Sequence, residues 1–206
     1  METLLNAFAV LFIVIDPIGV AAIFAALSRS HAIPARRRMA ITATLLAGTI
    51  LLVFLMFGDA LLGLLGITLP AFRIAGGVLL FLLAIDMVVV RQSGLRSTTS
   101  REQLEAEQKA DVSVFPLAFP LIAGPGAITT VLLMSARADG VADVVGLGLI
   151  IVLVMALTLV CLLFAAALSH RLGETGANVI SRLMGLLLAA LAMQFILDGL
   201  RTGLLG

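Results

Sequence analysis

Two short segments join a proline to residues that can contact a ligand, and each lies inside a long apolar stretch. They are Asp16, Pro17, Ile18 and Gly19 in the first segment, and Gly124, Pro125 and Gly126 in the second. Proline lacks an amide hydrogen and prefers the first position of a helix, and Asp or Gly before it suits the N-cap. Each segment therefore predicts the end of one half-helix and the start of another.

Two such helix ends, brought together, would form a binding site for an anion. Unpaired amides cannot face lipid, so the breaks must face protein or a water-filled cavity. Helix N-termini carry partial positive charge, and glycine after each proline leaves the backbone open to a ligand. A substrate carboxylate would suit this site. Further hydrogen-bonding groups are Thr129 and Thr130, with Asn6 or Ser135 in addition.

Asp16 is the single residue with the clearest chemical role. A carboxylate deep in a membrane is costly and marks a candidate functional site. It would bind the ammonium group of a zwitterion, or change its protonation state during transport and so couple transport to an ion. The structural alternative is an N-cap for the second half-helix, and the two roles do not exclude each other.

The sequence lacks the signatures of catalysis and of cofactor binding. It contains no His-Glu-x-x-His, no Gly-x-Ser-x-Gly and no Gly-rich phosphate loop, and its single cysteine, Cys161, lies in an apolar run. We therefore predict no catalytic residues, no metal site and no organic cofactor. The net charge of +1 gives no reason to expect a nucleic acid as partner.

The elements that position these residues are six predicted transmembrane helices. The 206 residues are 62% hydrophobic and 12% charged, against about 45–50% and 25% in soluble domains. A bilayer core needs about 20 apolar residues per helix. Six segments reach that length: 4–27, 39–63, 70–90, 113–135, 143–168 and 180–200. We expect an all-α membrane protein whose first and fourth helices are broken at mid-membrane.

A repeated spacing relates the two halves of the chain. Pro125 follows Pro17 by 108 residues. Arg182, expected to open the sixth helix, follows Arg73, expected to open the third, by 109 residues. Three spans in each half place the second half upside down relative to the first. The predicted organisation is a first three-helix repeat over 1–90, a cytoplasmic polar linker over 91–112, and a second, inverted three-helix repeat over 113–206.

The basic residues predict the orientation of the chain in a bacterial inner membrane. With both termini on the outer side, most of the 13 Lys and Arg fall in cytoplasmic loops, as the positive-inside rule requires. These residues are Arg29, Arg36, Arg37, Arg38, Arg91, Arg96, Arg101, Lys109, Arg171 and Arg182. Only Arg73, Arg137 and Arg201 are then expected on the outer side.

Several of these residues also carry a resemblance to a known family. They are Asp16 to Gly19, Gly76 with Gly77, Phe115 to Ala118 with Pro120, Gly124 to Thr129, and Arg182 with Gly185. Over nearly its whole length the chain resembles the MarC family of bacterial inner-membrane proteins. The resemblance implies six helices and membership of the wider lysine-exporter superfamily. From some archaeal relatives it also implies ion-gradient transport of small neutral amino acids such as glycine and alanine.

The leading hypothesis is a secondary transporter or exporter of small neutral amino acids of the glycine and alanine type. Its partners would be the lipid bilayer, a small zwitterionic solute and a coupling proton or sodium ion, and an oligomer is compatible with the sequence. Two alternatives stay open. One is a non-transporting membrane scaffold or regulator, in which the breaks only shape the fold, and the other is a passive channel for a small solute.

Overall fold

The computed structural model describes residues 2–89, 111–136, 138 and 140–205, which form helices joined by short loops. The helices are α1 (Glu2–Ile15), α2 (Pro17–Leu27), α3 (Ile33–Leu64), α4 (Leu69–Val89), η1 (Ser113–Ile122), α6 (Pro125–Ser135), α7 (Val141–Leu163) and α8 (Ala165–Leu205). The predicted linker over 91–112 lies almost entirely outside the described residues. The described part of the chain contains no strand, which confirms the predicted all-α class.

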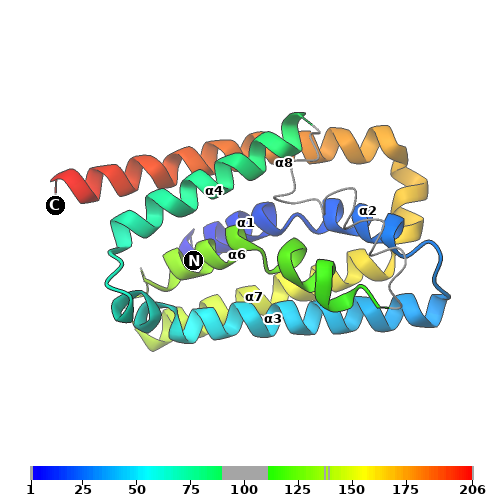
Figure 1. Ribbon diagram of the computed structural model, residues 1–206, viewed down its shortest axis with the longest axis horizontal. Coiled ribbons are helices and arrows are strands. Elements are labelled where there is room, and N and C mark those ends of the chain that lie inside the picture. Colours follow the sequence, from blue (N-terminus) through cyan, green and yellow to red (C-terminus); the bar gives the residue numbers. More distant parts are fainter. Residues whose placement is uncertain (1, 90–110, 137, 139, 206) are drawn as a thin grey trace.

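Five stretches are long and apolar enough to cross a membrane, and a sixth is bent. The first runs from Leu4 to Leu27 and includes both α1 and α2, whereas the bent one consists of η1 and α6, which meet at 52°. Successive spans run in opposite directions, and both termini lie in the left-hand half of the view (Figure 1). The number of candidate spans agrees with the predicted six.

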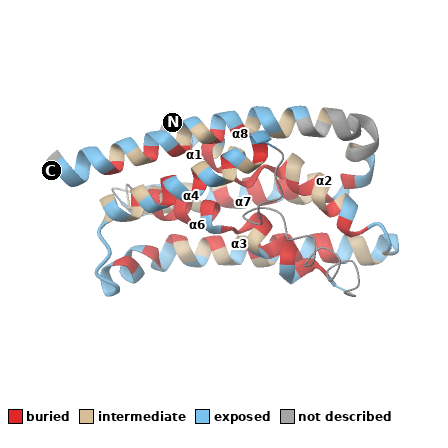
Figure 2. Cartoon of the chain, turned by 45° about the horizontal axis from the view of Figure 1, so that its top comes forward, coloured by how far each residue is buried: buried red, intermediate tan, exposed pale blue. Residues whose placement is uncertain are grey.

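The first span lies at the centre of the bundle. In its most apolar window 56% of the residues are buried, against 22% in the corresponding window of α7. Figure 2 shows buried residues concentrated in the middle of the molecule and exposed ones along its outer helices. Fully buried side chains come from both halves of the chain and include Leu11, Val20, Leu51, Leu117 and Val131. The first break is therefore enclosed by protein rather than by lipid.

Helices from the two halves of the chain are interleaved. The most extensive pairing joins α4 to α8, while α3 packs against α7 and α1 against α6 (Figure 1). Two further pairings, α2 with α8 and α4 with α6, connect the interrupted spans to the α4–α8 pair. Neither half could keep this core without the other.

Glycines make the contact between α4 and α8 close. A methyl group at Gly77 would lie 2.8 Å from the carbonyl oxygen of Ala192, and one at Gly185 would lie 2.7 Å from Cβ of Met87. Neither position leaves room for another carbon atom. Within a bilayer the hydrophobic effect does not drive helices together, so close packing through small residues is what stabilises such a pair. We call the contact of Gly77 and Gly185 with the facing helix the glycine seam.

The gap predicted between the fifth and sixth spans is not a gap between helices. The segments 143–168 and 180–200 predict a gap after residue 168, but α7 ends at Leu163 and α8 runs from Ala165 to Leu205. Arg182 therefore lies inside α8 and does not open a helix. Hydropathy marks the apolar part of a span, whereas a helix continues into polar sequence as long as its backbone hydrogen bonds are made.

The start of the second span also differs from the prediction. The apolar pattern indicated a start at residue 39, but α3 begins at Ile33, with Pro34 in its first turn. Proline suits that position because the first amides of a helix have no partner inside it. The arginine run that follows is consequently helical, and it extends α3 beyond its apolar part.

The half-span before Gly124 is not a regular half-helix. Within η1, Phe115 (φ −128°, ψ 125°) and Phe119 (φ −135°, ψ 128°) have extended backbones. Each precedes a proline, which disfavours helical geometry at the residue before it and removes one amide donor. Pro116 and Pro120 therefore replace the expected half-helix with irregular turns.

We expect Gly77→Ala to destabilise the folded protein by about 1–3 kcal/mol, because the added methyl must move α4 away from α8. Gly63→Ala is the matched control, since Gly63 lies inside α3 and a methyl there meets no atom within 4 Å. This control should leave stability unchanged or raise it by up to about 1 kcal/mol through helix propensity. Thermal unfolding of detergent-purified protein measures both, and equal losses would contradict close packing at the glycine seam.

Candidate functional site

The first break is closed by the side chain of Asp16. This residue lies between α1 and α2 in the left-handed region (φ 49°, ψ 69°) and is only 1% exposed. Its Oδ1 accepts a hydrogen bond of 3.1 Å from the amide of Gly19, in the first turn of α2. A methyl group at Gly19 would overlap the Asp16 carboxylate. Asp16 and Gly19 thus form a cap in which the carboxylate occupies the positive end of its own helix.

The backbone of Asp16 is also satisfied. Its amide donates to the carbonyl oxygen of Phe12 at 2.9 Å, and its own carbonyl oxygen accepts from the amide of Val20 at 3.0 Å. The chain can therefore turn inside an apolar core while these polar groups stay paired, as burial requires. The N-cap role weighed for Asp16 in the sequence is the role it has in this conformation.

The second break has no such cap. Gly124 precedes Pro125 with an extended backbone (φ −77°, ψ 174°), and as a glycine it has no side chain to offer the amides of α6. The first turn of α6 also contains no acidic residue. The positive end of this helix is consequently not matched by a carboxylate of its own, in contrast to α2.

A small hollow adjoins the second break. It measures about 40 Å³ and is lined by residues of α1, α4, η1 and α6, among them Val14, Leu83, Pro120, Gly124 and Gly126. One water molecule needs about 10–15 Å³ by this kind of measure. Small-molecule sites reach about 300–1,000 Å³. In this conformation the hollow has room for a few water molecules and not for an amino acid.

The structure brings some of the predicted site residues to this hollow and leaves others apart. Gly124, Pro125 and Gly126 line it, whereas Asp16, Pro17, Ile18 and Gly19 do not, and the first break approaches it only through Val14. Pro125 is exposed although Gly124 beside it is buried. The two breaks are thus neighbours across the α1–α6 contact and do not share one cavity.

Two of the hydroxyl groups expected to support a ligand form hydrogen bonds within their own helix. Thr130 donates to the carbonyl oxygen of Gly126 at 2.8 Å, and Ser135 donates to that of Leu132 at 3.2 Å. Thr129 is buried, and its methyl group fills the space beside Gly76. Asn6 is exposed on α1. Such bonds to the preceding turn are common for Ser and Thr in helices, and they can open when a ligand competes.

Two further residues pack inside the bundle. Arg73, expected to open the third helix on the outer side, is only 7% exposed near the start of α4. Cys161, which lies in an apolar run, packs against the core from the last turn of α7. A charged residue inside an apolar run was the available signal for Arg73.

The described residues contain no group of three or more His, Cys, Asp or Glu that could hold a metal ion. The described polar groups at the breaks are the carboxylate of Asp16, the hydroxyls of Thr129 and Thr130, and the N-termini of α2 and α6. Such groups can bind and release a small polar solute or a proton.

Comparison with known proteins places this architecture in a family. The sequence pattern of the MarC family integral membrane proteins matches residues 1–204. The chain belongs to the MarC family. It is similar to the UPF0056 membrane protein YvbG of Bacillus subtilis, with 38% identity over 96% of this chain and 94% of that protein. It is also similar to a UPF0056 membrane protein of Methanocaldococcus jannaschii, with 36% identity over 100% of this chain and 99% of the other.

A further relative extends the similarity to another bacterium. The UPF0056 membrane protein YhcE of Escherichia coli is 35% identical over 93% of this chain and 88% of its own length. No solved structure matches this chain. Together with the apolar spans, these similarities show that this MarC family protein is an integral, multi-pass membrane protein.

Variants of Asp16 should separate the stability that comes from its side-chain cap from the cost of its left-handed backbone. We expect Asp16→Asn to preserve stability, because Asn accepts the Gly19 hydrogen bond and tolerates the left-handed region. Asp16→Ala should cost about 2–3 kcal/mol, since it loses the cap and strains the backbone at once. Asp16→Gly should lie between the two, because it relieves only the strain.

Thermal unfolding in detergent measures this series. The order Asn, Gly, Ala from most to least stable is the expected result. An Asn variant as unstable as the Ala variant would show that the negative charge, rather than the hydrogen bond, stabilises the break.

Proposed function

We propose that this MarC family protein is a secondary transporter or exporter of small neutral amino acids such as glycine and alanine, driven by an ion gradient. It would act in the bacterial inner membrane with both termini on the outer side, and without catalysing a reaction. The observation that carries this proposal is the difference between the N-termini of α2 and α6. The N-terminus of α2 is capped by Asp16, whereas that of α6 has no side-chain cap and adjoins a hollow.

The uncapped end of α6 is the proposed place for a substrate carboxylate. Amides and partial positive charge at a helix N-terminus bind anionic groups, and Gly126 lets such a group approach the backbone. The proposed substrate-binding residues are the two segments named at the outset together with Thr129 and Thr130. Leu79 and Leu83 of α4 line the hollow, so α4 must move away from α6 before an amino acid can enter.

Asp16 is proposed as the partner of the substrate ammonium group and as the coupling residue. Its carboxylate is buried at the first break and already holds a cap that a proton would weaken. Protonation would loosen the first turn of α2, and binding of a zwitterion or sodium ion would favour the ionised form. Asp16 would then have a protonated and an ionised state, and an ion gradient could drive the change between them.

An inverted repeat would supply the alternation between the two faces. The pairings of α4 with α8 and of α3 with α7 each join equivalent helices under the predicted register, and that of α1 with α6 is equivalent to that of η1 with α2. The same pseudo-twofold relation converts the pairing of α2 with α8 into that of α6 with α4. Such symmetry supports a transporter in which the two halves exchange conformations around a central site.

Flux measurements test the proposal directly. Proteoliposomes containing the protein should take up or release labelled glycine or alanine in a saturable way that depends on a proton or sodium gradient. Pro125→Ala should lower the rate at least tenfold, because a restored amide and a helix running through Gly124 remove the uncapped end. Pro34→Ala, which changes a proline in the first turn of α3, is the matched control and should retain the rate.

The alternatives give different results in the same assay. Flux that neither saturates nor responds to a gradient would indicate a passive channel. A folded protein with no flux of any amino acid would favour a scaffold or regulator.

Asp16→Asn tests the coupling role. If the carboxylate titrates during transport, this variant should fold normally and lose the pH dependence of flux, because Asn preserves the cap but carries no proton. Flux should be measured over pH 5–8 for both proteins. An unchanged pH profile would reduce Asp16 to a structural cap and leave the rest of the proposal standing.

A further inference from the structure

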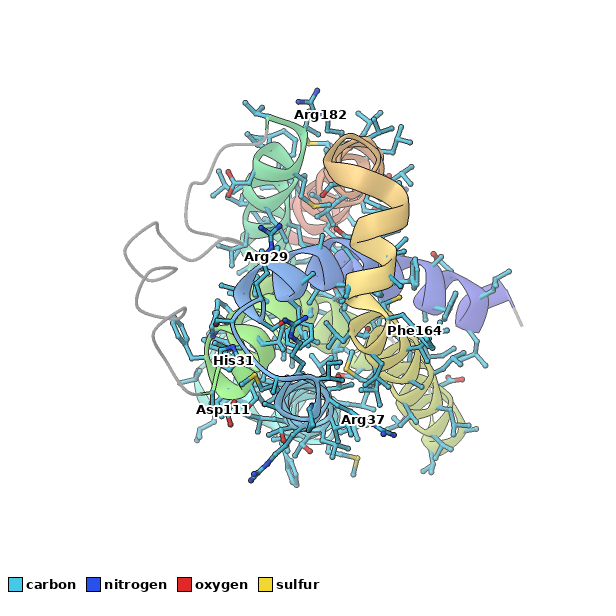
Figure 3. All side chains as sticks on the ribbon, turned by 90° about the vertical axis from the view of Figure 1, so that its right-hand side faces the viewer. Arg29, His31, Arg37, Asp111, Phe164 and Arg182 are labelled. Atoms are coloured by element: carbon cyan, nitrogen blue, oxygen red, sulfur yellow. The ribbon has the colours of Figure 1, made fainter. Side chains whose placement is uncertain are left out.

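A second cavity, far larger than the hollow at the breaks, lies where the α2–α3 loop meets the junction of α7 and α8. It measures about 440 Å³, and its lining includes Phe24, Ser28, Arg36, Arg37, Leu162 and Phe164. We call it the basic groove. Figure 3 views this end of the molecule, with Arg37 on α3 near Phe164 and with Arg29 and His31 in the adjoining loop. None of the residues proposed for transport lines it.

Positive charge accumulates at the groove, and none of the described residues that line it carries a carboxylate. The N-cap of α3 is Ala32, which offers no side-chain hydrogen bond, and the first turn contains no acidic residue. Arg36 and Arg37 therefore add their charges to the positive end of a 32-residue helix, an arrangement that the helix dipole disfavours. A bound anion would stabilise it.

The two arginines differ in what holds them. Arg36 donates from Nε to the carbonyl oxygen of His31 at 2.8 Å and from a terminal nitrogen to that of Arg29 at 2.6 Å. These bonds fix its position without neutralising its charge. Asp111, in contrast, interacts electrostatically with His31 and with Arg38, which does not line the groove. No described carboxylate forms an ion pair with Arg36 or Arg37.

A buried hydroxyl in the groove has no hydrogen-bond partner among the described residues. Ser28 caps the C-terminus of α2 through its backbone and is 1% exposed, yet its Oγ is bonded to no atom of the described part of the chain. Buried hydroxyls are normally satisfied, so one facing a cavity indicates a group that is bound there in the cell. An anionic oxygen would accept its hydrogen.

The rim of the groove is apolar and exposed. Ile33 is 80% exposed, Phe164 64% and Leu163 41%, and all three line the groove. In an integral membrane protein such exposed apolar side chains at the end of the spans can contact lipid. The groove thus joins an anion-binding end to an apolar wall that is open at its side, a combination suited to a molecule with an anionic head and an acyl chain.

We propose that the basic groove binds an anionic phospholipid of the surrounding leaflet. Its phosphate group would bind Arg36, Arg37 and the hydroxyl of Ser28, and an acyl chain would lie along Phe24, Leu162 and Phe164. The bound lipid links the end of α2 to the junction of α7 and α8. This site is separate from the proposed amino-acid site and does not depend on transport.

The test is a titration of detergent-purified protein with phosphatidylglycerol, followed by thermal unfolding. Phosphatidylcholine with the same acyl chains controls for the apolar part, and inorganic phosphate controls for the anion alone. The expected result is saturable stabilisation by phosphatidylglycerol only. Equal stabilisation by phosphatidylcholine, or full stabilisation by inorganic phosphate, would overturn the proposal.

Two variants locate the site. Arg37→Gln should weaken the apparent affinity for phosphatidylglycerol about fivefold, the effect of one basic residue at an anionic lipid surface. Arg201→Gln, an exposed arginine near the end of α8, is the matched control and should bind as the unmodified protein does. Ser28→Ala should also bind more weakly while its stability without lipid is not reduced, because the lost hydroxyl had no partner. Equal affinities of the Arg37 and Arg201 variants would place the lipid elsewhere and overturn the proposal.

Discussion

A polar backbone group inside a bilayer must find a partner within the protein, and the architecture of this chain follows from that constraint. Each interruption of a span exposes such groups, and the two interruptions are satisfied differently. At the first, the carboxylate of Asp16 bonds the amide of Gly19, and the span around it forms the centre of the bundle. At the second, Gly124 contributes no side chain, and the irregular turns of η1 pack between α3 and α2. The interleaved helices of the two halves enclose both interruptions within the protein.

Much of the fold could be predicted from composition and spacing. Apolar length located the spans, because the bilayer imposes it, and proline located the interruptions, because its missing amide acts wherever it occurs. Helix continuity could not be read in this way. The single helix of α8 includes a polar stretch that hydropathy assigns to a loop, and α3 extends into its arginine run. The extended backbones of Phe115 and Phe119 follow from the prolines after them, a local effect that is independent of apolar length.

The two helix starts were predictable from the sequence, whereas the packing around them was not. The sequence indicated that Asp16 could cap a helix and that the segment at Gly124 would form a second helix start. Whether a hydroxyl faces a ligand or its own helix depends on packing, and Thr130 uses its hydroxyl on the carbonyl oxygen of Gly126. The volume of the hollow likewise depends on α4, which is distant in sequence. A pattern of residue types identifies groups that can bind, whereas tertiary packing sets how far they are open.

The position of Cys161 has a practical consequence for spectroscopy. It is the only cysteine in the chain, and it lies half-buried in the last turn of α7. A thiol-directed fluorophore or spin label would therefore attach to a single known point without any prior mutagenesis. Because Cys161 packs against the buried core, the signal of the label would respond to movements of α7 relative to that core. The protein carries a natural attachment site for a reporter near the end of a spanning helix.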